Sequence, residues 1–317
     1  MTIKAFLKLV EIQTKLASVI PYIFGVVYTL YYFDTLKPLN ILFFFISLFS
    51  FDMFTTALNN YNDYRKAVRK YGYNYEYHNA IGQFKLKEST VRATVIILLT
   101  LAVVFGILTF YHSDYVVLIL GALSFSMGII YSAGPIPVSR TPLGELFSGF
   151  TMGFVIPFLV VYSSIFDRNY IVMTLSDATF TLQLNLKLLL PIFLISLPTV
   201  FCIANIMLAN NICDVDDDFE NRRYTLPIHV GTKKALILYD ALYFLTFLDI
   251  AVCVLLGYLP WFSILTLAAA FKVYKNIKLF HQVQSKKDTF ALAVLNMVII
   301  MVPLILTVLL GYIINLL

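Results

Sequence analysis

Long runs of apolar residues without a charged side chain recur along the chain and alternate with short polar stretches. Residues 93–110 (ATVIILLTLAVVFGILTF) and 294–314 are two such runs. A helix of about 20 apolar residues crosses the hydrocarbon core of a bilayer, because each residue advances it by about 1.5 Å. The pattern predicts an all-α polytopic membrane protein with nine membrane helices, at 15–33, 39–58, 93–111, 115–132, 143–165, 188–209, 235–256, 258–274 and 290–315.

The composition favours the same class of protein. The chain is 60% hydrophobic and 13% charged, whereas soluble globular proteins carry about 25% charged residues. A soluble protein with a very large core would not repeat uncharged runs of this length. The net charge of +5 comes from scattered Lys and Arg residues, so the clustered basic domain typical of nucleic-acid binding is not predicted.

The placement of basic residues predicts the orientation in the membrane. With the N-terminus inside, the inner segments hold 20 of the 23 Lys and Arg residues, and the outer segments hold Lys37, Arg168 and Lys187. Cytosolic loops of membrane proteins are enriched in Lys and Arg. We therefore expect a cytoplasmic N-terminus and an outer C-terminus.

Two long cytosolic loops, 59–92 and 210–234, open with similar phrases directly after a predicted helix. The first phrase is NNYNDY and the second, 151 residues later, is NNICDVDDD. They follow the second and sixth helices, which would cross the membrane in the same direction. We interpret this as two parallel repeats of four helices plus one helix, a pattern known in membrane folds, within a single domain of residues 1–317. The alternative is chance similarity between two short phrases.

If each preceding helix continues into its phrase, several oxygen-bearing side chains share one face. Residues four apart lie on the same side of a helix, and like charges there repel. A cation bound beside them would relieve that repulsion. The residues on this stripe are Asn59 and Asp63 in the first phrase and Asn210, Asp214 and Asp218 in the second, with Asp217 beside them.

The oxygen-only character of these side chains indicates the kind of ligand. Ligand sets without His or Cys suit Mg²⁺, which completes its shell with water and substrate phosphate. Two such clusters at the cytosolic mouth of a helix bundle predict a bound diphosphate. The alternative is a pair of solvated loops that bind nothing. Basic residues expected to bind the remaining phosphate charge are Arg65, Lys66, Arg140, Arg222 and Arg223.

At these phrases the sequence resembles the UbiA superfamily of intramembrane aromatic prenyltransferases. The superfamily carries N-x-x-x-D-x-x-x-D after the second of nine helices and D-x-x-x-D after the sixth, which Asn59-x-x-x-Asp63 and Asp214-x-x-x-Asp218 resemble. Residues 131–146 (YSAGPIPVSRTPLGEL) and 221–231 (NRRYTLPIHVG) look most like the branch that prenylates 1,4-dihydroxy-2-naphthoate in menaquinone biosynthesis. The resemblance implies a Mg²⁺-dependent enzyme, which we place in a bacterial plasma membrane.

The first phrase departs from the superfamily pattern. Ala67 stands where the third acid belongs, Asn60 where Asp is usual, and Arg69 where the naphthoate branch often has Asp. The segment 65–79 is basic and rich in tyrosine instead of acidic. These changes weaken one of the two expected Mg²⁺ sites.

The resemblance also implies a reaction and roles for single residues. The allylic C–O bond of a polyprenyl diphosphate would break while Mg²⁺ and basic side chains stabilise the leaving diphosphate. An aromatic acceptor would capture the allylic cation, with loss of CO₂ in the naphthoate branch. Tyr131 is our choice for stabilising that cation through its aromatic face, unless it is an interfacial anchor. Asp63 would bind metal, or orient the acceptor and take its proton. Glu145 would pair with Arg140, position the acceptor, or be solvated at the interface.

Three further acids lie in or near predicted spans, where ionisable residues are functional candidates by default. Asp52 lies two turns before Asn59 on the same face and is expected to line the pocket. Asp240 is close to the interface, and Asp249 lies deeper on the seventh helix.

The expected partners are a polyprenyl diphosphate, an aromatic acceptor and the bilayer, with no nucleic acid and no obligate protein partner. Three other readings stay open: a UbiA-type enzyme acting on 4-hydroxybenzoate or haem, a diverged member with little activity, and a cation-coupled carrier. A carrier should hold its acids near the bilayer midplane. Here the acids concentrate at one membrane face, which favours the enzyme.

Overall fold

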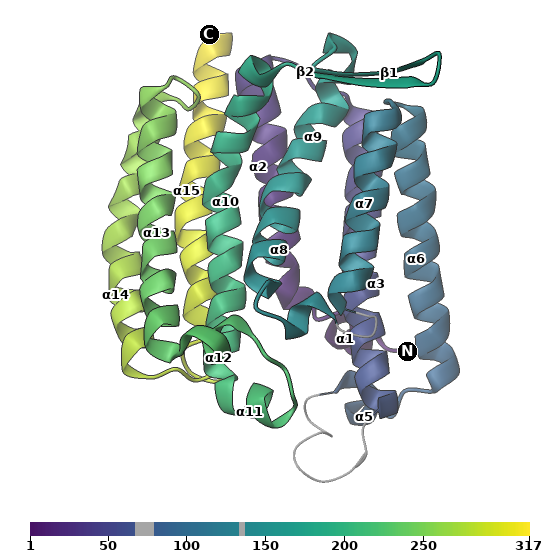
Figure 1. Cartoon of the computed structure of the whole chain (residues 1–317), viewed down its shortest axis with the longest axis vertical. Helices are drawn as coiled ribbons and strands as arrows, with labels where there is room; N and C mark the ends of the chain where they lie inside the picture. The colour runs from purple at the N-terminus through teal and green to yellow at the C-terminus, as the bar shows by residue number, and fades with distance from the viewer. Residues whose placement is uncertain (67–78, 133–136) are drawn as a thin grey trace. The chain divides into compact units, whose positions relative to one another are not determined.

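The computed structural model describes residues 1–66, 79–132 and 137–317. Its contacts divide the chain into two compact units, and Figure 1 shows long helices in each. The first unit comprises Met1–Val19 and Pro38–Ser132, and the second comprises Ile20–Lys37 and Ala133–Leu317.

Three long helices form the body of the first unit. Ser47 on α3 donates a 2.7 Å hydrogen bond to the Ala102 carbonyl on α6, and Phe51 stacks on Phe125 of α7 with ring centroids 4.1 Å apart. A buried cluster that includes Leu9 joins the short helices α1 and α5 to α3 and α6. The elements are α1 (Ile3–Leu9), a 3-10 turn (Ile12–Lys15), α3 (Pro38–Lys66), α5 (Ala80–Gln83), α6 (Glu88–Tyr111) and α7 (Tyr115–Ser132).

The second unit contains the remaining long helices. Its core is aromatic and aliphatic, with Tyr162, Ile195 and Tyr239 fully buried. α2 starts in the first unit and runs mostly in the second. The helices are α2 (Leu16–Phe33), α8 (Gly144–Phe150), α9 (Ile156–Ile165), α10 (Leu186–Cys213), α11 (Val215–Glu220), α12 (Leu226–Val230), α13 (Thr232–Leu255), α14 (Ala269–Gln282) and α15 (Ala291–Leu316).

A π-helical segment, Thr151–Val155, joins α8 to α9 and packs directly on the backbone of α10. A Cβ added at Gly153 would lie 2.4 Å from the Val200 Cα. Thr199 donates a 2.6 Å hydrogen bond to the Gly153 carbonyl. A π segment loosens the regular hydrogen-bond ladder, so this hydroxyl satisfies a carbonyl that would otherwise be buried without a donor.

The predicted spans agree closely with the helices. Within the described residues, eight helices are long and apolar enough to cross a membrane. The predicted eighth span, 258–274, is not among them. That part of the chain is a 3-10 helix, Trp261–Ala268, followed by α14, which runs on to Gln282 and exposes Lys272, Lys275 and Lys278. The structure confirms an all-helical polytopic membrane architecture, apart from one small sheet.

That sheet is an antiparallel hairpin between α9 and α10, which the all-α expectation did not include. Strands β1 (Ile171–Ser176) and β2 (Thr179–Leu184) pair in register from Ile171 opposite Leu184 to Ser176 opposite Thr179. Figure 1 shows the hairpin lying crosswise to α9 and α10.

Candidate active site

The first phrase lies on the last two turns of α3, as predicted. α3 continues without a break to Lys66, so Asn59 and Asp63 are one turn apart. The Asn59 side-chain nitrogen donates a 3.3 Å hydrogen bond to Ser132 Oγ at the end of α7. This bond uses the amide nitrogen, so the carbonyl oxygen is the atom of that group able to bind a cation. The side chain of Asp63 is exposed.

Two neighbours of this phrase have structural contacts. Asn60, which stands where the resemblance leads one to expect Asp, donates to the Leu9 carbonyl at 2.9 Å and to Glu11 at 3.2 Å. It therefore holds the N-terminal segment against α3. Arg65 is exposed, with its guanidinium 5.9 Å from the centre of the Tyr61 ring.

Some of the sequence predictions fall outside the described residues. These are the departures at Ala67 and Arg69, most of the basic segment 65–79, and residues 133–136 of the signature stretch. Lys66 is the last residue of α3. Tyr131 is half-buried near the end of α7.

The second phrase does not continue one helix, which corrects the prediction of an unbroken stripe. α10 ends at Cys213, Asp214 takes a non-helical conformation (φ −104°, ψ 13°), and α11 begins at Val215. Backbone bonds nevertheless run from Asp214 N to Asn210 O (3.2 Å) and from Asp218 N to Asp214 O (2.7 Å). The spacing of four residues is thus kept across the break.

Asp218 is the most enclosed acid of the phrase. It is 3% exposed, with one carboxylate oxygen 3.2 Å from Arg223 Nε and the other accepting a 3.3 Å bond from Thr225. Burial raises the pKa of Asp218, Arg223 lowers it, and the charge of Asp214 raises it further. A cation near both carboxylates would oppose the effects of burial and repulsion.

A helix-ending turn brings Arg223 to Asp218. Arg222 adopts the left-handed region (φ 54°), its N–H bonds to the Phe219 carbonyl at 3.2 Å, and the Arg223 N–H bonds to the Asp218 carbonyl at 2.8 Å. This is the bond pattern of a Schellman motif, in which Gly usually occupies the left-handed position. The strained Arg222 is exposed, and the fold-back turns the next side chain onto the buried carboxylate.

Lys286 is a site residue that the sequence reasoning missed. Its ammonium group forms an ion pair with the Asp214 carboxylate. Lys286 lies between α14 and α15, 72 residues along the chain, so neither spacing nor motif connects it to the phrase. The positive charges of Lys286 and Arg223 therefore both lie beside carboxylates of the second phrase. Asp216 and Asp217 are both exposed.

The signature stretch contributes two residues that come close to the second phrase. The Tyr224 N–H donates to the Arg140 carbonyl at 3.1 Å, while the Arg140 side chain is exposed. Glu145 is 4% exposed, which excludes the predicted interfacial solvation, and it accepts a 2.8 Å bond from Asn211 instead of pairing with Arg140.

Glu145 and Asn211 leave two buried oxygens without a donor among the described residues, Glu145 Oε2 and Asn211 Oδ1. A buried acceptor without a partner costs roughly 1–3 kcal/mol, and more if it is charged. Two such atoms on neighbouring side chains are available to accept hydrogen bonds from water or from a ligand. Asn211 directly follows the predicted Asn210, but nothing in the pattern distinguished it.

The remaining acids have partners of their own. Asp52 is bound by Lys15 at 2.6 Å and by Ser18 at 2.5 Å, so its carboxylate belongs to a buried ion pair. Asp249 accepts a weak bond from the Cys253 thiol at 3.6 Å.

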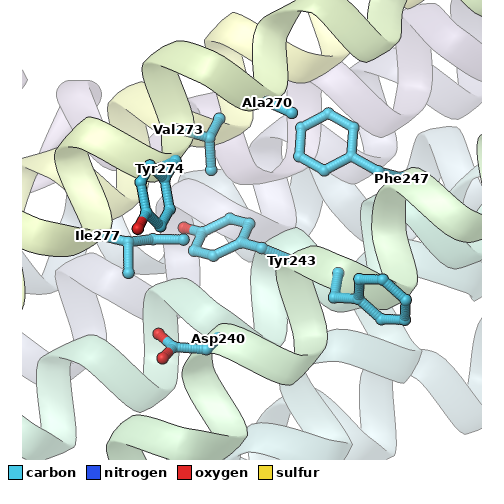
Figure 2. Close-up of a pocket in the computed structure, with 8 residues that line it drawn as sticks. Asp240, Tyr243, Phe247, Ala270, Val273, Tyr274 and Ile277 are labelled. Carbon is cyan, nitrogen blue, oxygen red and sulfur yellow. The ribbon is translucent and has the colours of Figure 1, made fainter.

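Asp240 is 2.9 Å from His281, at the rim of a groove of about 240 Å³ between α13 and α14. Figure 2 shows the groove walls, which are mostly apolar and include Tyr243 and Phe247.

The donor set fits Mg²⁺ rather than a metal with a closed protein cage. In the part of the chain that the structure describes, no group of three or more His, Cys, Asp or Glu side chains could hold a metal by itself. Mg²⁺ needs no such cage, because it binds through one or two carboxylates and completes its shell with water and phosphate. Asp214 and Asp218 would supply those carboxylates, and the positive charges of Lys286 and Arg223 lie beside them.

The comparisons with known proteins show the family of the chain. The profile of the UbiA prenyltransferase family matches residues 18–300. A relative from Bacillus subtilis (strain 168), 1,4-dihydroxy-2-naphthoate octaprenyltransferase, is 26% identical over 260 residues, covering 81% of this chain and 76% of that protein.

Solved structures show the same fold. A UbiA homolog from Aeropyrum pernix K1 in its apo form aligns with a TM-score of 0.66 at 18% identity, covering 96% of this chain and 98% of its own. A UbiA homolog from Archaeoglobus fulgidus bound to DMAPP and Mg²⁺ aligns with a TM-score of 0.59 at 13% identity, covering 96% and 98%. Family membership favours the enzyme over the carrier. The chain belongs to the UbiA prenyltransferase family and is a multi-pass membrane enzyme.

Proposed function

We propose that this protein transfers a polyprenyl group from a polyprenyl diphosphate to 1,4-dihydroxy-2-naphthoate, with loss of CO₂ and release of diphosphate. The observation that carries the proposal is the second phrase, where two carboxylates, Asp214 and Asp218, are each paired with a cation. Acids interleaved with basic groups suit a metal–diphosphate complex, because the acids bind the metal and the basic groups bind phosphate oxygens.

Each predicted residue has a role in this proposal. Mg²⁺, when bound, supplies positive charge to the diphosphate as the allylic C–O bond breaks. Lys286 joins the basic set, because its ammonium group already lies against Asp214. The proposed metal ligands are Asn59, Asp63, Asn210, Asp214 and Asp218, and the proposed phosphate-binding residues are Arg65, Lys66, Arg140, Arg222, Arg223 and Lys286, with Asp217 beside them.

The acceptor needs groups that hold it and remove its proton. Glu145 and Asn211 present two buried oxygens that have no donor among the described residues, and a phenolic hydroxyl of the acceptor would donate to one of them. Asp63 stays the alternative proton acceptor. Tyr131 would present its aromatic face to the allylic cation, a contact worth about 2 kcal/mol when desolvated.

The choice of naphthoate as acceptor rests on two observations. The signature stretches 131–146 and 221–231 resemble the naphthoate branch, and the Bacillus subtilis relative is named for that acceptor. Of the two stretches, the second contains Arg223 and Thr225, which hold Asp218.

We further propose how the chain lies in the membrane. The helical run from Trp261 to Gln282 would be the remaining span, the eighth in chain order. It brings the total to nine and completes two parallel repeats of four helices plus one within a single catalytic domain. The distribution of basic residues supports an orientation with the N-terminus and both phrases in the cytoplasm and the C-terminus outside a bacterial plasma membrane. The exposed lysines of α14 can reach the interface through their long side chains.

The test is a prenyl-transfer assay on the purified protein in liposomes, with a polyprenyl diphosphate and either 1,4-dihydroxy-2-naphthoate, 4-hydroxybenzoate or haem as acceptor. We expect product and CO₂ with the naphthoate only, and no turnover when EDTA removes Mg²⁺. Turnover with another acceptor would replace the naphthoate assignment, and turnover without a divalent ion would refute the metal site.

A further inference from the structure

The hairpin β1–β2 has one apolar face and one polar face. Its register places Ile171 opposite Leu184 and Met173 opposite Leu182. Successive residues of a strand alternate between the two faces of a sheet, so Phe180 lies on this same face. The opposite face carries Val172, Thr174, Ser176, Thr179, Thr181 and Gln183.

The apolar face is largely uncovered by the part of the chain that the structure describes. The exposed fractions are 61% for Phe180, 47% for Leu182 and 47% for Leu184. The strands carry no charged residue, and Asp177 lies in the two-residue turn with Ala178. The polar face has its own contact, between the hydroxyls of Thr174 and Thr181.

A hairpin of this kind needs something to cover its apolar face. Two isolated strands are marginally stable at best in water. The turn adds strain, because Asp177 and Ala178 both have positive φ (46° and 61°), a conformation for which Asn-Gly or Asp-Gly is preferred. An apolar phase against Phe180, Leu182 and Leu184 would supply the missing stabilisation.

The place of the hairpin in the fold indicates which apolar phase this is. α10 begins at Leu186, two residues after the end of β2, and ends at Cys213 within the second phrase. These 28 residues span about 42 Å, more than the roughly 30 Å of the hydrocarbon core. The hairpin therefore lies at the membrane face opposite that phrase. Figure 1 shows it crosswise to α10, which is the direction of the membrane plane.

The base of the hairpin carries positive charge suited to lipid phosphates. Arg168 before β1 and Lys187 after β2 are both exposed. The Arg168 guanidinium also donates to the Phe33 carbonyl at 3.1 Å, and the Asn185 N–H donates to the Tyr170 carbonyl at 3.0 Å. These bonds fix the base, so the hairpin extends from a rigid point at headgroup level.

We propose that β1–β2 is an interfacial anchor that buries its apolar face in the lipid leaflet opposite the second phrase, with Arg168 and Lys187 at the phosphate level. The polar face, with Thr181 and Gln183, faces water. The anchor holds the ends of α9 and α10 at a fixed depth in the bilayer. It is independent of the proposed acceptor and of metal binding.

The test places a tryptophan on each face and measures which quencher reaches it. The chain has a single Trp, so Trp261→Phe provides a silent background. Leu182→Trp reports the apolar face, and its neighbour Gln183→Trp is the matched control at the same distance along the hairpin. Phe180→Trp, which keeps an aromatic side chain, repeats the measurement if Leu182→Trp does not fold. The proteins are reconstituted in phosphatidylcholine–phosphatidylglycerol vesicles with or without brominated acyl chains.

We expect brominated lipid to quench Leu182→Trp and Phe180→Trp severalfold more strongly than Gln183→Trp, and aqueous iodide to show the reverse order. Equal quenching of both faces by iodide would overturn the proposal, because the hairpin would then project into water. Shielding of Leu182→Trp from both quenchers would also overturn it, because protein, such as a second copy of the chain, would then cover the face.

Discussion

The buried ion pair between Lys15 and Asp52 gives a quantitative test of the first unit. Lys15 is 3% exposed, and its ammonium group contacts Asp52 Oδ1 at 2.6 Å, the Asp52 carbonyl at 3.0 Å and Thr56 Oγ1 at 2.7 Å. Lys15→Met keeps the length of the side chain but leaves the carboxylate with Ser18 as its neighbour. Removing one partner of a buried pair costs roughly 3–5 kcal/mol, because the other charge stays buried without compensation.

The assay is thermal unfolding in one detergent at one scan rate, since membrane proteins unfold irreversibly and the rate affects the midpoint. At about 2 °C per kcal/mol for a chain of this size, Lys15→Met should lower the midpoint by roughly 6–10 °C. The double variant Lys15→Met with Asp52→Asn removes both charges and should recover most of that loss. A double variant no more stable than Lys15→Met would refute the argument. Loss of activity without loss of stability in Asp52→Asn would instead support the earlier expectation that Asp52 lines the substrate pocket.

Two further predictions concern the second unit. Gly153→Ala places a Cβ 2.4 Å from the Val200 Cα, so we expect several kcal/mol of overpacking and loss of the monodisperse peak in size-exclusion chromatography. Gly121→Ala, with nothing within 4 Å of its Cβ, is the control that should stay monodisperse, and equal behaviour of the two would contradict the close packing. Asn211→Ala removes the donor to Glu145 and should lower stability by roughly 1–3 kcal/mol. Glu145→Gln in the same protein should restore part of the loss in thermal unfolding, and no difference between the variants would argue against the buried pair.

The helices could be predicted from sequence because the bilayer imposes a simple pattern. A span must be apolar over about 20 residues, and the predicted 188–209 became Leu186–Cys213. The acidic phrases were likewise visible, because spacing along one helix fixes which side chains share a face. The prediction for the eighth span was least accurate, because it ended at residue 274, before the lysines at 275 and 278. An amphipathic helix can expose lysines on one side, and α14 continues through them.

What the sequence did not reveal depends on contacts between distant residues. Lys286 and Asp214 are 72 residues apart, and Lys15 and Asp52 are 37 apart. No period or motif connects such pairs, since packing brings them together. The break at Asp214 is likewise not visible in the spacing, because the Asp214 N–H and the Asp218 N–H still bond four residues back. Residues 171–184 do alternate between apolar and polar side chains, which is the pattern of β-strands. Long apolar runs, from which the spans were predicted, do not include this pattern.

The central claim is that the carboxylates of the second phrase bind the metal–diphosphate complex, and single amide substitutions test it most directly. Each of three variants, Asp214→Asn, Asp218→Asn and the control Asp216→Asn, removes one negative charge from the unmodified protein. Asp216 is an exposed neighbour of the site. Prenyl transfer should fall by about a hundredfold or more in the first two variants and stay near normal in Asp216→Asn, with all three proteins folded by thermal unfolding. Near-normal turnover in both Asp214→Asn and Asp218→Asn, or an equal loss in Asp216→Asn, would contradict the account.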